Sequence, residues 1–356
     1  MSPDFVRPTI RSMEGYTPGE QPAAGDRVVK LNTNENPFPP SPKVLEAIRK
    51  IGADSLRRYP NPTADQFRSA AGKLLGVIPD MILAGNGSDD ILTIATRTFV
   101  PPGGSIAFPE PTYSLYPVLS QLEEARSIAV EWGKDFSLPI DALLATKANA
   151  IYLANPNAPT GTFVPPAKVA ELAKAFTGVI LVDEAYADFA EDNCLILVHD
   201  HPNVVISRTL SKAYSLAGLR FGYAVAQPQV ISEMMKVKDS YNTDAVSIVA
   251  ATAAIEDQQY AAGIWERIRS ERKRLTSELT RLGWSVLPSR ANFVLATVPD
   301  SRGREAYLGL KQRGVLVRYF DKPGLTDKVR ITVGTADETD ALLNAIKLLF
   351  RTEKVA

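Results

Sequence analysis

Short apolar runs alternate with amphipathic segments along the middle of this chain, and this alternation constrains the fold more than any other feature. The runs lie at residues 105–108, 150–154, 179–182, 204–207 and 223–226. Apolar runs with few or no polar residues are typical of strands that are buried on both faces. Because strands that alternate with helices form βαβ units, the pattern predicts an α/β protein with a mostly parallel sheet flanked by helices.

The 356 residues of the chain are enough for two domains of ordinary size. The first 35 or so residues are rich in proline, glycine and polar residues, which predicts an extended N-terminal arm. From residue 245 to residue 282 the pattern is that of one long helix, where Glu and Arg alternate as on a solvated face. A smaller α/β pattern follows, with strands expected at 284–287, 293–297, 315–319 and 329–333. We therefore predict an arm at 1–40, a large domain at 41–245 and a small C-terminal domain at 246–356.

The residue counts exclude several classes of function. The 40 Lys and Arg residues balance 40 Asp and Glu residues, whereas a nucleic-acid-binding protein usually carries a basic surplus. Cys194 is the single cysteine, which excludes internal disulfides and zinc sites built on cysteine pairs and indicates a reducing, cytoplasmic compartment. No apolar run approaches the roughly 20 residues that cross a bilayer, so we expect no membrane partner.

His199 and His201 are the two histidines of the chain, in the sequence Leu-Val-His-Asp-His-Pro-Asn. A histidine-based triad or metal site would have to be built from them alone. The turn residues around them indicate a surface turn instead of half a metal site, and we expect no metal. Acid–base chemistry in this chain must therefore depend on Lys, Asp, Tyr or a cofactor.

Three polar segments contain candidate catalytic or binding residues. Such residues are expected after the predicted strands, because an open parallel sheet binds its ligands at the carboxyl ends of its strands. Asp183 and Tyr186 follow the run at 179–182, and Lys212 lies among hydroxyl groups after the run at 204–207, with Arg220 further along. Residues 85–89, Gly-Asn-Gly-Ser-Asp, open a helical pattern, where free N–H groups favour a phosphate. An ordinary helix N-cap explains this last segment equally well.

Together these segments suit pyridoxal 5′-phosphate (PLP). A lysine amine forms a Schiff base with its aldehyde, and an acid keeps its ring nitrogen protonated. Arginine, hydroxyl groups and a helix N-terminus bind its phosphate.

The segments at 155–161, 183–186 and 211–220 resemble the cofactor-binding motifs of fold-type I PLP-dependent aminotransferases. Those at 31–37, 58–60 and 330–334 narrow the resemblance to the histidinol-phosphate aminotransferase family. The motifs occur in order over nearly the whole chain. The resemblance implies a fold-type I transferase with a large PLP-binding domain, a smaller C-terminal domain and an N-terminal arm.

By this resemblance three residues are catalytic. Lys212 would form the Schiff base and move the proton between the substrate and the cofactor, while Asp183 would pair with the ring nitrogen. Tyr186 would donate a hydrogen bond to the 3′-oxygen of the cofactor. Tyr113 resembles the aromatic residue that stacks on the ring, and a tyrosine packed in the core is the alternative for that position.

The resemblance also implies a phosphate site and a homodimer. The residues expected around the phosphate are Gly87, Ser88, Asp89, Thr209, Ser211 and Arg220. Tyr59 resembles a tyrosine that reaches the phosphate of the other subunit.

One position departs from the family pattern. Most relatives carry an asparagine directly before Pro-Thr-Gly, and it contacts the 3′-oxygen, but Ala158 occupies that position here. Asn157, one residue earlier, is the candidate substitute at the cofactor, and Asn155 is expected to be a structural turn residue.

Arg330 resembles the arginine that binds the carboxylate of the amino-acid partner, and its fork suits a phosphate as well. Tyr16 and Arg318 match further substrate contacts, although a surface ion pair is the alternative for Arg318. The implied reaction converts L-histidinol phosphate and 2-oxoglutarate into imidazole-acetol phosphate and glutamate, in histidine biosynthesis. An aromatic-amino-acid aminotransferase, a threonine-phosphate decarboxylase and a non-catalytic PLP-binding regulator are the alternatives.

Overall fold

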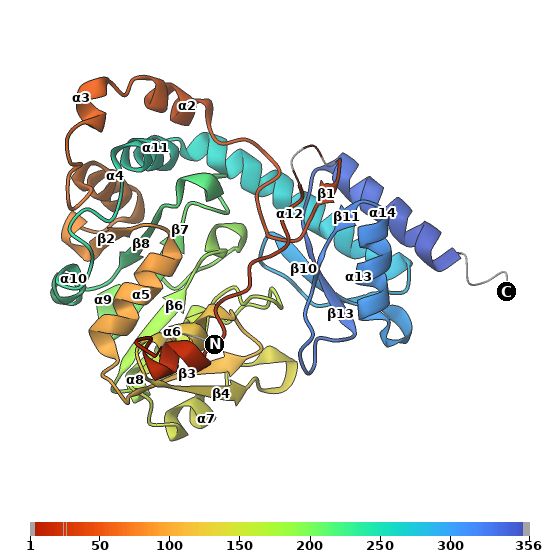
Figure 1. Ribbon diagram of the computed structural model, residues 1–356, viewed down its shortest axis with the longest axis horizontal. Helices are drawn as coiled ribbons and strands as arrows, with labels where there is room; N and C mark the ends of the chain where they lie inside the picture. The colour runs from red at the N-terminus through yellow and green to blue at the C-terminus, as the bar shows by residue number, and fades with distance from the viewer. Residues whose placement is uncertain (1–3, 24, 26, 352–356) are drawn as a thin grey trace.

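The computed structural model describes residues 4–23, 25 and 27–351, and its larger part is built on a seven-stranded sheet (Figure 1). The strand order is β2 (Ile82–Gly85), β8 (Gly222–Val225), β7 (Val204–Thr209), β6 (Val179–Asp183), β5 (Ala150–Ala154), β3 (Ser105–Glu110) and β4 (Arg126–Glu131). Strands β4, β3, β5, β6 and β7 are parallel, and β8 runs antiparallel to both of its neighbours. The mostly parallel sheet and its five predicted strands are confirmed, whereas β2 and β4 were not predicted.

Alternate residues of the central strands enter two separate hydrophobic cores. In β6, for example, Ile180 and Val182 belong to one core and Leu181 to the other, and all three are fully buried. One core is shared with α5 (Ser88–Phe99), α6 (Leu115–Leu122) and α10 (Pro228–Met235), and the other with α4 (Asp65–Leu75), α8 (Pro166–Ala175) and α11 (Ala245–Glu256). The central strands are therefore apolar on both faces, which explains their uninterrupted apolar runs.

The long helix expected at 245–282 is two helices, so that prediction was wrong. Helix α11 ends at Glu256. The next residue, Asp257, has non-helical backbone angles (φ −101°, ψ 58°), and α12 (Gln258–Arg281) starts after it. The Asp257 carboxylate accepts hydrogen bonds from Ser41 Oγ at 2.5 Å and Lys43 Nζ at 2.9 Å. Helix α11 packs against α2 (Pro42–Arg49) and α4, while α12 extends to the smaller part of the molecule (Figure 1).

The smaller part contains a second, antiparallel sheet in the order β12 (Arg318–Tyr319), β13 (Lys328–Thr332), β10 (Phe293–Thr297) and β9 (Ser285–Val286). Helix α13 (Gly303–Gln312) packs against β12 and β13, and α14 (Ala336–Arg351) packs against α12 and α13. The single strand expected at 315–319 is divided at Val317. Its first half, β11 (Val315–Leu316), pairs with β1 (Val29–Lys30), and its second half, β12, pairs with β13.

The N-terminal segment is only partly extended. Helix α1 (Pro8–Ser12) packs against α6, and β1 then pairs in parallel with β11, so the segment spans both parts of the molecule (Figure 1). The domain limits at 40 and 245 stay predictions. The remaining short helices are α3 (Ala53–Leu56), α7 (Ile140–Ala145) and α9 (Leu197–Asp200), with 3₁₀ turns at Pro79–Met81, Lys134–Phe136, Ala187–Phe189, Ala217–Leu219 and Pro299–Ser301.

His199 is exposed in α9, but His201, just after that helix, is buried, so the predicted surface turn fits only the first histidine. Across the described part of the chain, no three or more His, Cys, Asp or Glu side chains are grouped as metal ligands. In the same residues, no helix combines the length and apolarity that a membrane crossing requires.

A buried ion pair joins the ends of β6 and β7. Arg208 Nε and Nη2 donate to Glu184 Oε2 at 3.0 and 2.7 Å, and both side chains are almost fully buried. Removing one partner of a buried pair leaves an uncompensated charge. We expect Glu184→Gln to lower the free energy of unfolding in urea by about 3–5 kcal/mol.

The matched control is Glu171→Gln, in the exposed pair between Glu171 and Lys168 (2.7 Å). This change should leave the free energy of unfolding unaltered, because exposed pairs contribute little. Equal effects of the two substitutions would contradict the role given to the Arg208–Glu184 pair.

Candidate active site

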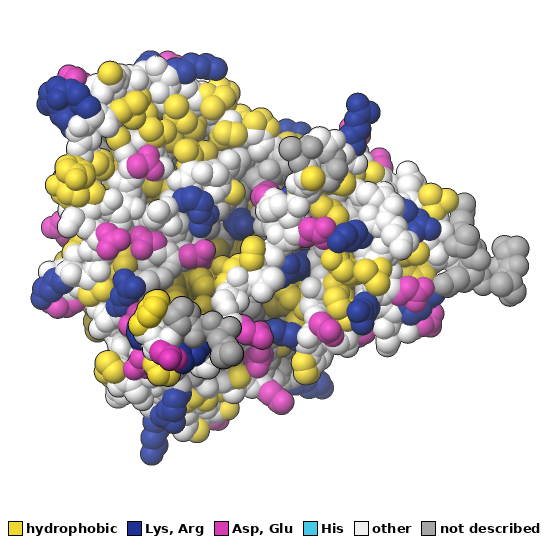
Figure 2. Space-filling model, viewed as in Figure 1, with side chains coloured by type: hydrophobic (Ala, Val, Ile, Leu, Met, Phe, Trp, Pro, Cys, Tyr) yellow, Lys and Arg dark blue, Asp and Glu magenta, His cyan; other side chains and the backbone are white. Residues whose placement is uncertain are grey.

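A cavity of about 1050 Å³ lies where the carboxyl ends of the central parallel strands face β12 and β13 of the smaller part. The face of the molecule in Figure 2 is hollowed near its centre, where basic and apolar side chains gather. The predicted site residues that line the cavity are Tyr16, Ser88, Asp89, Tyr113, Asp183, Tyr186, Thr209, Ser211, Lys212, Arg220, Arg318 and Arg330. Twelve side chains that are far apart in the sequence therefore share one cavity.

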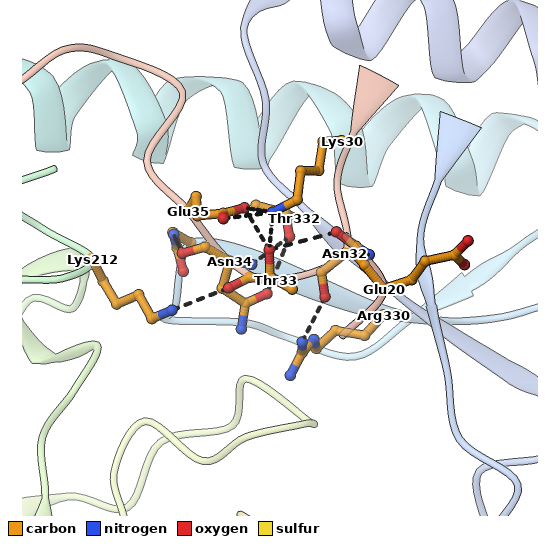
Figure 3. A network of polar contacts seen from close by, with 10 residues as sticks. Glu20, Lys30, Asn32, Thr33, Asn34, Glu35, Lys212, Arg330 and Thr332 are labelled. Atoms are coloured by element: carbon orange, nitrogen blue, oxygen red, sulfur yellow. Dashed lines mark hydrogen bonds and ion pairs between the residues drawn. The ribbon is translucent and has the colours of Figure 1, made fainter. Parts of the chain in front are cut away.

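Lys212 follows β7 and is partly buried, and its Nζ donates to the main-chain oxygen of Thr33 at 3.0 Å (Figure 3). Burial, reinforced by the nearby positive charge of Arg330, lowers the pKa of Lys212 to about 8, while Glu35 and Asp89 oppose this shift. An amine with such a pKa is neutral in a sizeable fraction of molecules near neutral pH. It can therefore act as a nucleophile or a base.

Asp183 ends β6 and is buried at the bottom of the cavity. Its Oδ2 accepts a hydrogen bond from Tyr116 Oη at 3.1 Å, and its Oδ1 accepts one from the Ala185 N–H at 3.3 Å. Burial raises the pKa of Asp183 to about 7; the hydrogen bond from Tyr116 opposes the shift and the charge of Asp89 adds to it. A cationic N–H group in the cavity would stabilise the ionised carboxylate.

Tyr186 is placed on the same wall by contacts from the N-terminal segment and the smaller sheet. Its Oη accepts a hydrogen bond from Asn34 Nδ2 at 2.9 Å, and its ring meets the Phe293 ring edge-on, with centroids 5.0 Å apart. Burial raises the pKa of Tyr186, which keeps the phenol protonated and able to donate.

Tyr113 lies on the cavity wall and is partly buried. Its Oη donates to Asp89 Oδ1 at 3.2 Å, and its ring meets those of Tyr16 and Tyr116 edge-on, at centroid distances of 5.9 and 5.7 Å. One side of this ring cluster borders the cavity, so the position is compatible with stacking on a ligand as well as with packing.

The segment around the N-terminus of α5 forms a cradle for an anion. Arg220 Nη1 donates to Ser211 Oγ at 3.3 Å, and Arg220 Nη2 lies 3.6 Å from Asp89 Oδ2. Gly87 has a positive φ of 87°, and a Cβ atom there would come within 2.7 Å of Arg220 Nη2. The backbone angle therefore favours glycine at 87, and a side chain there would also displace the Arg220 guanidinium.

Thr209 and Ser211 complete the cradle at the end of β7. Thr209 Oγ1 donates to Ser211 Oγ at 3.0 Å, and the Ser211 N–H donates to Thr209 Oγ1 at 3.2 Å. Hydroxyl groups, a guanidinium and a helix N-terminus at one end of the cavity are the donors that phosphate requires.

Arg330 and Arg318 form the opposite wall. Arg330 Nη2 donates to the Asn32 carbonyl at 3.0 Å, and its buried Nε has no hydrogen-bond partner among the described residues. Arg318 donates to the carbonyls of Thr17 and Pro18 at 3.2 and 3.3 Å. Two guanidinium groups therefore face the cavity with donor capacity for an anionic ligand.

Three predicted cofactor residues, Gly87, Asn157 and Tyr59, do not line this cavity, and Gly87 lies next to it beneath Arg220. The buried Asn157 amide donates to the Pro111 carbonyl (3.0 Å) and Thr160 Oγ1 (2.8 Å) and accepts from Thr112 Oγ1 (2.9 Å), so its polar atoms serve the turn. Tyr59 is 80% exposed and stacks on the Tyr241 ring at a centroid distance of 4.3 Å.

Asn155 is buried beside the same turn. Its Nδ2 donates to the Val164 carbonyl at 2.9 Å and its Oδ1 accepts from the Val164 N–H at 2.8 Å. Asn155 therefore holds the main chain of this turn, as expected for a structural turn residue.

Residues 26–346 match the family described as Aminotransferase class I and II. The chain belongs to this family. The aminotransferase is 44% identical over 344 residues to "Histidinol-phosphate aminotransferase 1" of Nostoc sp., which covers 97% of this chain and 98% of the relative. It is 46% identical over 343 residues to "Histidinol-phosphate aminotransferase" of Rhodopirellula baltica, with 96% and 94% covered.

Among solved structures, the aminotransferase resembles the histidinol-phosphate aminotransferase of Sinorhizobium meliloti in complex with pyridoxal-5′-phosphate. The TM-score is 0.90 and the sequence identity 28%, and the match covers 99% of each chain. Fold-type I architecture, expected from the sequence motifs, is thereby confirmed.

Sequence reasoning missed three residues of the aminotransferase that contact the predicted site. Tyr116 binds Asp183, Thr33 binds Lys212, and Asn34 binds Tyr186. Thr33 and Asn34 lie in the segment at 31–37, and the resemblance of that segment to the family motif could have indicated them. Tyr116 had no such signal.

Proposed function

We propose that this aminotransferase uses PLP to transfer the amino group of L-histidinol phosphate to 2-oxoglutarate, giving imidazole-acetol phosphate and glutamate. The observation that carries the proposal is the placement of the Lys212 amine in one cavity with the Asp183 carboxyl and the anion cradle at Arg220. The names of the relatives from Nostoc and Rhodopirellula support the substrate. The ligand of the Sinorhizobium enzyme supports the cofactor.

The residues of the cavity fit PLP. The buried Asp183 carboxyl gains a cationic partner if a protonated ring nitrogen lies against it. Ser88, Ser211 and Arg220 supply donors for the phosphate, and Tyr113 borders the space between the two ends. When bound, PLP supplies an aldehyde that condenses with an amine and a ring that withdraws electrons from the α-carbon of the substrate.

Lys212 then carries the proton chemistry. With PLP bound, its Nζ would take the proton from the substrate α-carbon, for which the amine must be neutral. Burial and the charge of Arg330 favour the neutral amine. Asp183 would keep the ring nitrogen of the cofactor protonated, and Tyr186 would donate to its 3′-oxygen.

Arg330 suits both substrates of such an exchange. The planar guanidinium binds a carboxylate or a phosphate through two parallel hydrogen bonds, and its buried Nε has a free donor among the described residues. One arginine can therefore hold the carboxylate of glutamate in one half-reaction and the phosphate of histidinol phosphate in the other. Arg318 and Tyr16 border the same end of the cavity.

A substrate comparison tests this proposal. With 2-oxoglutarate as acceptor, we expect kcat/KM for histidinol phosphate to exceed that for phenylalanine or tyrosine by at least about 100-fold. The phosphate has more charge and more acceptor oxygens for the guanidinium groups of Arg330 and Arg318 than the single carboxylate of an aromatic amino acid. A preference for the aromatic amino acids would contradict the proposal in favour of an aromatic aminotransferase. Release of carbon dioxide from threonine phosphate would contradict it in favour of a decarboxylase.

We further propose a cytoplasmic homodimer. The exposed stack of Tyr59 on Tyr241 supports a partner surface beside the loop at 58–60, since large exposed aromatic groups often mark interfaces. Cys194 is a buried free thiol, which agrees with a reducing compartment.

A further inference from the structure

Asn34 lies in a left-handed turn of the N-terminal segment and is almost completely buried (φ 58°, 1% exposed). Its Nδ2 donates to Tyr186 Oη at 2.9 Å, across 152 residues of sequence. Figure 3 shows Asn34 within the polar network that also reaches Lys212. The contact joins a side chain without an assigned role to one of the three proposed catalytic residues.

The orientation of the Asn34 amide is determined by its other contacts. Its Oδ1 accepts a hydrogen bond from Thr332 Oγ1 at 3.1 Å, and its own N–H donates to the same Thr332 oxygen at 3.0 Å. The Asn34 carbonyl accepts from Asn292 Nδ2 at 2.9 Å. Thr332 Oγ1 already accepts from the Asn34 N–H, and Asn34 Oδ1 is the acceptor that the structure gives its hydrogen, so the NH₂ group faces Tyr186.

A donor at this position decides what the Tyr186 hydroxyl can do. Tyr186 Oη accepts from Asn34, so its own hydrogen points away from Asn34. The remaining direction for that hydrogen is the cavity that Tyr186 lines. The tyrosine is thereby prepared to donate to an oxygen of a bound ligand.

Among the described residues, the other candidate amides near this site have different partners, and Asn32 Nδ2 donates to the Glu20 carbonyl at 2.8 Å. Ala158 carries no side-chain amide, and the Asn157 amide is used by Pro111, Thr112 and Thr160. We propose that Asn34 is a positioning residue that directs the Tyr186 O–H toward the 3′-oxygen of the cofactor. This inference rests on the proposed function.

The same turn also holds Lys212, whose Nζ donates to the carbonyl of Thr33, the neighbour of Asn34. An ion pair between Lys30 and Glu35 closes the turn on its other side. Residues of this turn therefore contact both Lys212 and Tyr186, the two groups expected at the reactive end of the cofactor. Charged and titratable groups surround both side chains. Those that face Tyr186 are Arg330, Asp183 and Tyr16, and those that face Lys212 are Arg330, Glu35, Asp89 and Arg220.

The test is a pH titration of the visible absorbance of the PLP-loaded enzyme, compared among wild type, Asn34→Gly, Tyr186→Phe and the double variant. Glycine is chosen because it accepts the positive φ of position 34 without strain. When the 3′-oxygen loses a donor, its negative charge holds the proton on the Lys212 nitrogen more tightly. We expect Asn34→Gly to raise the apparent pKa of this absorbance change by about half a unit, which is about a threefold change in the equilibrium.

The double variant tests whether Asn34 acts through Tyr186. If it does, Asn34→Gly adds no further shift in the Tyr186→Phe background. An unshifted Asn34→Gly enzyme, or shifts that add in the double variant, would overturn the inference. Should Asn34→Gly fail to fold, Asn34→Asp keeps the shape of the side chain and presents only acceptors to Tyr186. Its negative charge alone also raises the apparent pKa, so it is compared with Asn34→Asp in the Tyr186→Phe background, and equal rises in the two backgrounds would overturn the inference.

Asn157→Ala is the matched control, since it removes a buried amide of the same kind. It is expected to lower the melting temperature and leave the absorbance pKa unchanged, and a shift as large as that of Asn34→Gly would contradict our assignment. A wild-type protein that takes up no PLP would overturn the proposed function together with this inference. Normal PLP uptake without a shift overturns this inference alone.

Discussion

Replacing Lys212 with alanine is expected to lower kcat for transamination by at least about 10,000-fold, the upper range of what a positioned acid–base group contributes. The variant loses both the amine that binds the cofactor covalently and the base that moves the proton. Rapid-mixing absorbance measurements of a single turnover, with PLP and histidinol phosphate supplied together, give the rate of the chemical step. A variant that keeps more than about one hundredth of the wild-type rate would remove Lys212 from the assigned role.

The fold should survive this substitution. Lys212 lines an open cavity, so its truncation leaves no void in the core. The pKa of Lys212 is lowered to about 8 in the folded chain. Below that pH the charged amine therefore destabilises the folded state. This destabilisation disappears when the pH rises above the pKa of lysine in the unfolded chain. Without PLP, the melting temperature of Lys212→Ala at neutral pH is therefore expected to equal or exceed that of wild type. Lys236→Ala, in an exposed ion pair with Glu233, is the matched surface control.

Asp183→Asn is expected to lower kcat by about 100- to 1,000-fold, the range seen when one preorganised electrostatic group is removed. The amide has the shape of the carboxyl but no negative charge to keep a proton on the nitrogen that faces it. The electron-withdrawing power of the cofactor ring therefore falls. Steady-state rates measured at saturating PLP separate this effect from weaker cofactor binding, and a kcat within about threefold of wild type would contradict the assignment.

The same substitution has the opposite effect on the stability of the protein without PLP. Burial raises the pKa of Asp183 to about 7, well above the value of an exposed aspartate. The folded state therefore holds this proton more tightly, and the wild-type protein loses stability as the pH rises from the unfolded pKa through the folded one. Urea unfolding should show Asp183→Asn as the more stable protein above the folded pKa, with the difference shrinking as the pH falls. A difference that grows toward low pH would contradict this account.

Residues that follow buried strands could be found from the sequence. Apolar runs place the sheet, and the carboxyl ends of its strands place Asp183 and Lys212 without any knowledge of their contacts. Arg220 was found because it follows Lys212 closely in the chain, and both line the cavity. Functional side chains at the ends of buried strands can therefore be predicted from the local sequence pattern alone.

Residues that depend on long-range contacts could not be found in this way. Asn34 meets Tyr186 and Thr332 because β1 of the N-terminal segment pairs with β11, close to the smaller sheet. No local periodicity encodes that pairing, since β1 has only two residues. Asn157 shows the converse, because the sequence reveals an amide near the cavity but not that neighbouring turn residues use it.

The split helix at Asp257 has a similar cause. The helical pattern continues through this residue in the sequence, but Ser41, directly before α2, and Lys43 in α2 bind its carboxylate. Such a break depends on a tertiary contact, which overrides local helix propensity.

The central claim is that Lys212 is the residue that binds PLP, and chemical fixation tests it most directly. The PLP-loaded enzyme is reduced with borohydride, digested and analysed by mass spectrometry. We predict that the cofactor mass is found on the peptide that contains Lys212 and on no other peptide. A cofactor attached to a different lysine, or a protein that takes up no PLP, would contradict the account.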